Sequence, residues 1–210
     1  AKGAKKPTSK LSGHIEPINF VEVYYTSRNS LPSVSQIQSI NSFMKIKSNY
    51  DLLLRAQYLV ELSEKFFSEE ANNNSQLEIL IETINQLSKT DHPDLVILVY
   101  EFEILKSHGF GLRIFECLNC SKSLAKSSNY FSYTNGGFYC ESCLGEVHAN
   151  EEVVKFSVED QVIFRSIERK AYNELLNLDI KDLSIKKLSG ALRKSISNVL
   201  GVQLKTSRFL

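Results

Sequence analysis

The stretch Cys117-Leu118-Asn119-Cys120 and its counterpart Cys140-Glu141-Ser142-Cys143 contain the only four cysteines of this 210-residue chain. Two residues between paired cysteines let one tight turn aim both sulfurs at one point, and two such turns complete a tetrahedral set of thiolates. The segment between the pairs is long enough to bring the second pair back to the first. The spacing therefore predicts a zinc site with Cys117, Cys120, Cys140 and Cys143 as ligands.

Other readings of the cysteines are two disulfides, a redox C-x-x-C motif, burial as small hydrophobes, and an iron–sulfur cluster. No apolar secretion signal follows the basic N-terminus, and no apolar run approaches the roughly 18 residues of a membrane span. We therefore expect a cytoplasmic, reducing compartment, where paired cysteines are metal ligands more often than disulfides. Four thiolates fill the zinc coordination sphere, so the predicted site is structural. His148 is more typical of an exposed histidine than of a ligand.

Between the cysteine pairs, a hairpin is predicted. The aromatic run 130–133 leads into Asn135-Gly136, and Phe138-Tyr139 resumes the strand pattern. An Asn-Gly pair between two such runs is the strongest short hairpin signal. Neighbouring residues on a strand face opposite sides, so one of Phe138 and Tyr139 is expected inside and the other outside.

Upstream of the cysteines, the pattern changes from strand-like to helical. Residues 18–25 are β-branched or aromatic, and 34–40 suggest a second extended piece, although its spacing of three also fits a helix turn. Helices are then predicted from an N-cap at Ser48 or Asn49, and from Asp91-His92-Pro93 to a stop at Gly109. The apolar stripes expected to be buried in three helices are Leu52, Ala56, Leu59, Val60 and 62–66; Leu77, Leu80, Ile81, Ile84 and Leu87; and Leu95, Leu98, Val99, Phe102 and Leu105.

Downstream, the run 157–160 resembles a capping box and opens a helix predicted over 158–177. A last helix is expected from Ser184 to Gly201. The fold class predicted from these patterns is α+β, with a β segment over 1–45, helical stretches over 48–110 and 150–210, and the cysteine block over 112–146 between them.

A basic arm is the strongest candidate for nucleic-acid binding. The formal net charge is only +1, so affinity for DNA requires a local patch. Lys2, Lys5, Lys6 and Lys10 precede the first acidic residue, Glu16, and clustered lysines bind phosphates by releasing counterions together. A solvated, frayed terminus explains the same lysines equally well.

Two further features are compatible with nucleic-acid contacts. Arg165, Arg169 and Lys170 form a second basic cluster, although Glu168 and Glu174 can pair with them. Aromatic side chains able to stack on bases, but more often buried in strands, are Tyr24, Tyr25, Phe131, Tyr133, Phe138 and Tyr139. The sequence has no glycine-rich phosphate loop, nucleophile elbow or histidine-framed carboxylate pair, so no catalytic residue and no enzyme activity are predicted.

The order of these features resembles the bacterial recombination mediator family RecO. The segments that carry the resemblance, in collinear order, are the lysine–glycine run 2–10, Ile15-Glu16-Pro17-Ile18, 56–62, 100–110, the two cysteine pairs with Gly136-Gly137-Phe138 between them, and 204–208. Thr8 stands where the family often has a basic residue. The chain opens on Ala1 without the strands that precede this motif in the family, so we expect an N-terminally truncated form with a partial OB-fold.

The resemblance implies three parts: an OB-fold remnant over 1–45, one mainly helical domain over 48–110 and 150–210, and a zinc ribbon over 112–146 inserted between its helices. It also implies DNA repair and recombination. It implies binding and annealing of single-stranded DNA, binding of double-stranded DNA, partnership with RecR and single-strand binding protein, and RecA loading as the outcome, in the bacterial cytoplasm at the nucleoid. On this resemblance, the phosphate contacts are assigned to Lys2, Lys5, Lys6 and Lys10. A competing hypothesis is a zinc-ribbon adaptor that binds only proteins; a metal-dependent hydrolase is disfavoured by the closed ligand set.

Overall fold

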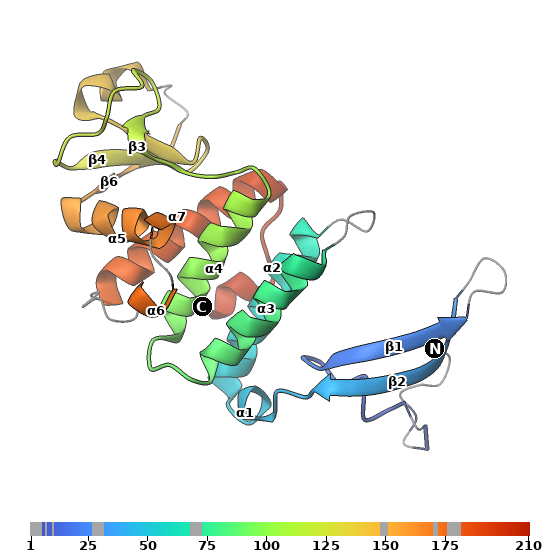
Figure 1. Cartoon of the computed structure of the whole chain (residues 1–210). Coiled ribbons are helices and arrows are strands. Elements are labelled where there is room, and N and C mark those ends of the chain that lie inside the picture. The colour runs from blue at the N-terminus through green and yellow to red at the C-terminus, as the bar shows by residue number, and fades with distance from the viewer. Residues whose placement is uncertain are drawn as a thin grey trace.

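The computed structural model describes residues 6, 8, 9, 11–26, 32–67, 73–147, 151–169, 172–175 and 182–210. Figure 1 shows three regions along the chain: a β hairpin, a group of packed helices, and a small sheet on the far side of those helices. The chain is therefore an α+β protein, as predicted. No helix within the described residues is both long enough and apolar enough to cross a bilayer.

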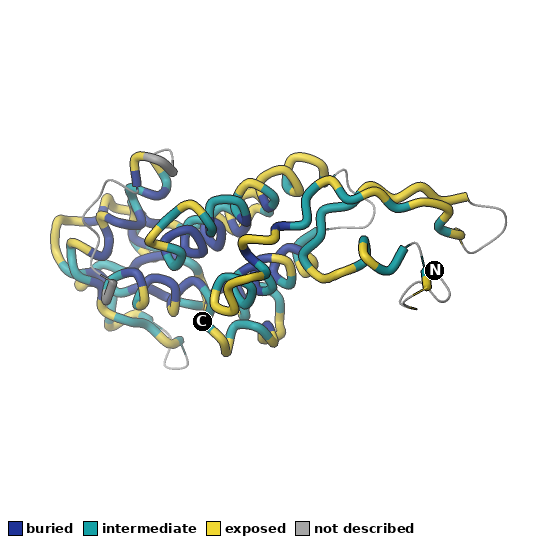
Figure 2. Tube along the Cα trace, turned by 90° about the horizontal axis from the view of Figure 1, so that it is seen from below, coloured by how far each residue is buried: buried dark blue, intermediate teal, exposed yellow. Residues whose placement is uncertain are grey.

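The hairpin consists of β1 (Phe20–Thr26) and β2 (Ser33–Asn41), which pair antiparallel. The second piece is thus a strand, not the helix turn that its spacing also allowed. Figure 2 shows that the pair extends from the helices with mostly exposed or half-buried residues; Tyr25 and Ile40 are 64% and 58% exposed. The described residues of this region form only these two strands, so the OB-fold stays a prediction.

Helix α1 (Met44–Lys47) is a short turn, and α2 (Tyr50–Phe66) begins where the sequence predicted. The Asn49 side chain accepts hydrogen bonds from the N–H groups of Asp51 (3.0 Å) and Leu52 (3.2 Å), so Asn49, not Ser48, is the N-cap. Helix α3 (Asn74–Leu87) packs beside α2. Two apolar stripe residues are more exposed than expected, Val60 and Leu77, both at 38%. Glu64 and Lys65, within the run 62–66, are exposed as well.

Helix α4 (Pro93–Ser107) lies at the centre of the helical group. It begins on Pro93 and ends before Gly109, whose positive φ of 83° fits a helix terminus. Residues between the predicted stripe positions, such as Val96 and Ile97, are also buried. A helix that is apolar on all sides is covered on all sides, and α4 indeed packs against α2, α3 and α7 (Asp182–Leu200).

The small sheet has the order β3-β5-β4-β6. Its strands are β3 (Arg113–Cys117), β4 (Asn129–Ser132), β5 (Gly137–Tyr139) and β6 (Val153–Phe156). The β4–β5 hairpin turns through Asn135-Gly136 as predicted, with Gly136 at φ 58°. At Gly137 a Cβ atom would come within 2.9 Å of the Arg113 carbonyl oxygen, so glycine permits the close approach of β3 and β5.

The remaining helices cover this sheet and close the bundle. Helix α5 (Val158–Arg169) starts with the predicted capping box: Ser157 Oγ accepts from Asp160 N, and Asp160 Oδ2 accepts from Ser157 N, each at 3.1 Å. The single helix predicted over 158–177 is instead α5 and a separate α6 (Tyr172–Leu175). Two 3-10 helices complete the fold, η1 (Glu141–Glu146) and η2 (Thr206–Phe209).

One aromatic cluster joins the sheet to α5. Phe131, Phe138, Phe156 and Phe164 are each 0% exposed, with ring centroids 5.2 to 6.5 Å apart. Phe131 and Phe138 are thus core residues, which confirms for these two the alternative that they are buried in strands. Tyr139, next to Phe138, is partly exposed, as strand alternation predicts.

Candidate metal centre and basic surfaces

The first cysteine turn forms at the end of β3. Cys117 N donates to the Lys122 carbonyl (2.9 Å), Ser121 N donates to the Cys117 carbonyl (3.0 Å), and Ser121 adopts a positive φ of 55°. The second turn follows β5, where Cys143 N donates to the Cys140 carbonyl at 3.1 Å as η1 begins. The parallel pairing of β3 with β5 places the two turns side by side.

These turns bring all four cysteine sulfurs together. The Sγ atoms of Cys117, Cys120, Cys140 and Cys143 lie within 4.8 Å of one another, and those of Cys120 and Cys140 are 4.0 Å apart. No disulfide joins these four cysteines in the structure. A tetrahedral zinc site with Zn–S distances near 2.3 Å has sulfurs about 3.8 Å apart, so the cluster is compatible with a metal site.

The electrostatics of the cluster also fit a cation. Burial raises the pKa of the Cys117 thiol, but N–H groups of Cys140, Cys120 and Asn119 donate to its sulfur and lower that pKa to about 6. The Asn119 side chain lowers the pKa of Cys143, but hydrogen bonds with the other three sulfurs, together with burial, raise it to about 12. Adjacent thiolates repel one another unless a cation offsets their charge, so this donor set suits a thiolate-binding metal.

Asn119 was not singled out from the sequence. It occupies the second position between the cysteines of the first pair, and its side chain donates to Glu146 at the far end of η1. It thereby links the two cysteine turns. A polar residue between paired cysteines is the signal that could have indicated this role.

The basic arm lies mostly outside the described residues. Lys2, Lys5 and Lys10 are among the residues not described, and Lys6 is exposed. His14, which follows the arm, lies against the hairpin, with Nδ1 2.8 Å from Ser39 Oγ. The grouping of the lysines into one DNA-binding site therefore stays a prediction, as does any ligand role for His148, which is also outside the described residues.

The second basic cluster does not form the ion pair with Glu168 that the sequence allowed. Glu168 pairs with Lys106 of α4 at 3.1 Å, and no ion pair joins it to Arg165 or Arg169 within the described residues. Both arginines lie over the ring of Phe115 on β3. Phe115 could not be identified from the sequence, because its contact with α5 joins residues far apart in the chain.

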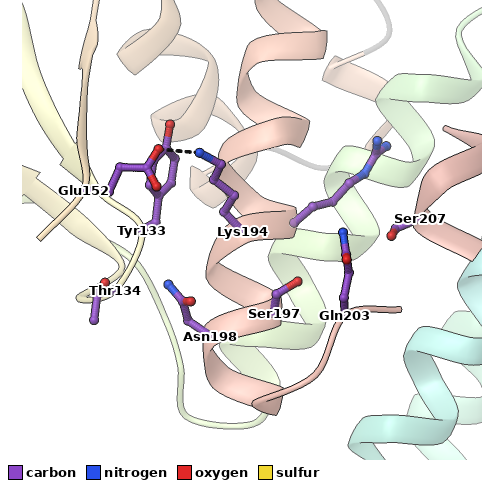
Figure 3. A pocket seen from close by; sticks show the side chains of 9 residues that line it. Tyr133, Thr134, Glu152, Lys194, Ser197, Asn198, Gln203 and Ser207 are labelled. Atoms are coloured by element: carbon purple, nitrogen blue, oxygen red, sulfur yellow. Dashed lines mark hydrogen bonds and ion pairs between the residues drawn. The ribbon is translucent and has the colours of Figure 1, made fainter. Parts of the chain in front are cut away.

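A polar cavity of about 590 Å³ lies between the β4–β5 turn, α7 and the C-terminal segment. Figure 3 shows Lys194 beside Glu152 and Tyr133 on one side of it, with Gln203 and Ser207 on the other. Its two basic side chains are already paired, Lys194 with Glu152 and Arg193 with the buried Glu101. The cavity therefore has no uncompensated charge with which to attract an ion.

The sequence matches the family described as the C-terminal region of Recombination protein O over residues 47–208. The chain belongs to the RecO family. A protein of Dehalococcoides mccartyi strain BAV1, named DNA repair protein RecO, is 31% identical over 95% of this chain and 78% of its own length. Proteins of the same name from Caldicellulosiruptor saccharolyticus and Shouchella clausii are 27% and 24% identical, over 98% and 100% of this chain and 77% and 80% of theirs. The RecO match includes the cysteine cluster and the helices around α4.

Proposed function

We propose that this RecO-family chain is a mediator of recombinational DNA repair. It binds single- and double-stranded DNA, anneals complementary single strands, and helps to load RecA together with RecR and single-strand binding protein in the bacterial cytoplasm. The observation that carries the proposal is the RecO match over 47–208, together with relatives named DNA repair protein RecO that align along the whole chain. The proposed role is not enzymatic.

Annealing needs no covalent chemistry. Two DNA strands repel each other through their phosphates, and lysine ammonium groups that neutralise those phosphates let the strands approach. Base pairing then supplies the free energy. Phosphate contacts carry no sequence information, which suits a protein that must anneal any sequence. We assign these contacts to Lys2, Lys5, Lys6 and Lys10.

The cysteine cluster is proposed to hold zinc in a structural role. Cys117, Cys120, Cys140 and Cys143 supply four thiolates, which leaves no open position for a reacting water. A bound zinc ion supplies a covalent brace between the two turns. The sheet that carries them has strands of only three to five residues, and such a small unit gains much of its stability from a metal.

The basic arm provides the test of DNA binding. A Lys5→Ala/Lys6→Ala double variant should bind single-stranded DNA more weakly, by a similar factor for unrelated sequences, because phosphate contacts are not sequence-specific. The slope of log affinity against log salt should fall by roughly 0.7 for each lost contact. Fluorescence anisotropy with labelled oligonucleotides over a salt series measures both, after circular dichroism has shown that the variant is folded.

The same experiment distinguishes the protein-binding adaptor. An adaptor should retain DNA weakly, and its retention should not depend on these lysines. If affinity and salt slope of the double variant equal those of the parent chain, the arm is a solvated terminus. The assignment of the phosphate contacts is then wrong, and a parent chain that also fails to anneal complementary strands would favour the adaptor.

A further inference from the structure

Two arginines of α5 share one aromatic ring on β3. The guanidinium carbon of Arg169 lies 4.5 Å from the ring centroid of Phe115, and that of Arg165 lies 5.9 Å from it. The arginines are four residues apart, which places them on one face of the helix. Arg169 is exposed, whereas Arg165 and Phe115 are half-buried. We name these three residues the arginine platform.

The platform carries positive charge without a carboxylate partner among the described residues. Arg165 Nε donates to the Ile114 carbonyl (3.1 Å), and its Nη2 donates to Gln161 Oε1 (3.4 Å), both neutral acceptors. Arg169 contacts the Phe115 ring, and no carboxylate or carbonyl of the described residues accepts a hydrogen bond from its guanidinium.

Two acidic residues next to the platform in sequence, Glu168 and Glu116, pair with other basic side chains. Glu168 pairs with Lys106 at 3.1 Å, and Glu116 of β3 pairs with Arg113 at 3.6 Å. Among the described residues, neither carboxylate forms an ion pair with Arg165 or Arg169. The sequence adds a third basic residue immediately after them, Lys170.

Holding two guanidinium groups close together costs free energy because their charges repel, and a bound anion would offset this cost. Burial, and then the like charge of Arg169, lower the pKa of Arg165, which shows that the two cations repel each other. The contact with Phe115, 4.5 Å from the Arg169 guanidinium carbon to the ring centroid, can hold the guanidinium in place. A guanidinium edge fixed in this way can donate two parallel hydrogen bonds to a phosphate.

We propose that Arg165 and Arg169, held on the ring of Phe115, bind phosphate groups of a nucleic-acid backbone beside the cysteine-bearing sheet. The inference rests on the proposed DNA-binding function and assigns to it a second site, separate from the N-terminal lysines. A nucleic-acid backbone is favoured over an acidic protein segment because its phosphates match the guanidinium edge and repeat along the strand. Such a site binds phosphates of any sequence.

The test uses the zinc-loaded full chain and a fluorescein-labelled oligothymidine, measured by anisotropy between about 50 and 200 mM salt. Arg169→Ala should lower the magnitude of the salt slope by roughly 0.7 and weaken binding about fivefold at about 0.1 M salt. Arg169→Lys keeps the charge and should retain the slope, but should bind more weakly because an ammonium cannot form the paired hydrogen bonds. Phe115→Leu keeps an apolar side chain without the aromatic face and should also weaken binding.

Lys89→Ala is the matched control, because it removes one exposed positive charge that lies 4.0 Å from Glu82 on α3. It should leave affinity and slope unchanged. Equal loss in Lys89→Ala and Arg169→Ala would show a general charge effect and overturn the platform. An unchanged Arg169→Ala beside a weakened Lys5→Ala/Lys6→Ala variant would overturn the platform alone and leave the proposed function standing.

Two further outcomes are decisive. A parent chain that does not bind the oligonucleotide overturns the proposed function and the platform together. If Arg169→Ala keeps full DNA affinity but loses binding to a labelled polyglutamate peptide, the surface recognises an acidic protein segment, and the nucleic-acid proposal is overturned.

Discussion

Replacing Arg193 with methionine should destabilise the fold in a way that depends on pH. Glu101 is 0% exposed at the centre of α4; its Oε1 accepts a hydrogen bond from Arg193 Nε at 2.9 Å and another from Tyr58 Oη at 2.7 Å. Its second oxygen, Oε2, has no hydrogen-bond partner in the described residues. Methionine retains the apolar length of the arginine side chain but removes the one cation that pairs with this carboxylate among the described residues.

The size of the effect follows from the burial of Glu101. Removing one partner of a buried ion pair costs about 3–5 kcal/mol, because the other charge remains buried. The Glu101 carboxyl can avoid part of this cost by binding a proton. Protonation itself costs about 1.36 kcal/mol for each pH unit above the pKa that the carboxyl has in the unfolded chain. With an ordinary pKa of 4.5 for the unfolded chain, protonation limits the loss of stability in Arg193→Met to about 5 kcal/mol at about pH 8 and about 1.4 kcal/mol at about pH 5.5.

The direction in which folding shifts the pKa of Glu101 determines whether stability rises or falls with pH. Burial raises the pKa of Glu101, while Arg193 and Tyr58 lower it only in part, so the folded protein holds this proton more tightly than the unfolded chain. Stability therefore falls as pH rises from the unfolded pKa toward the folded one. Without Arg193 the folded pKa rises further, and the loss of stability in the variant should grow from about pH 5.5 to about pH 8.

Urea unfolding followed by far-ultraviolet circular dichroism, on zinc-loaded parent and variant at both pH values, measures the difference. Adding Glu101→Gln to Arg193→Met removes the buried charge and should recover most of the stability lost at the higher pH. If the loss of stability in Arg193→Met is the same at both pH values, or if Glu101→Gln does not relieve it, Arg193 contributes packing alone. Either result would refute the electrostatic argument.

Two other predictions concern local structure. Ser157→Ala removes the hydroxyl that caps α5 and should lower the free energy of unfolding by about 1 kcal/mol, whereas Ser166→Ala on the same helix should have little effect in the same urea titration. Purified parent chain should contain about one zinc ion per molecule by elemental analysis, as one tetrahedral site requires. Cys140→Ser should lower this content and loosen the sheet; a parent preparation without metal, never exposed to chelator, would contradict the zinc assignment.

Local patterns in the sequence predicted much of the secondary structure, because local physics decides it. Asn49 caps α2, the Ser157–Asp160 capping box opens α5, and Asn135-Gly136 turns the β4–β5 hairpin. Each signal lies within a few residues and needs no knowledge of the tertiary fold. The paired cysteines belong to the same class, because two short turns fix their geometry.

Long-range pairing could not be predicted in the same way. The Arg193–Glu101 bond joins residues 92 positions apart, and nothing in the charge pattern of α4 distinguishes Glu101 from an exposed glutamate. Strand β6 was missed because residues 153–156 carry no turn signal of their own and pair only with β4. The stack of Arg169 on Phe115 depends on how α5 crosses β3, which periodicity does not specify.

The aromatic cluster connects the metal centre to the arginine platform. Phe138 is two residues before Cys140 and packs against Phe164 of α5, with ring centroids 6.5 Å apart. Phe115 is two residues before Cys117 on β3, the strand that α5 packs against. The cysteines therefore hold the ends of the two strands that support α5 and its arginines. The proposed zinc would tighten those strand ends, so its removal should also disturb the orientation of Arg165 and Arg169 and weaken their proposed phosphate contacts.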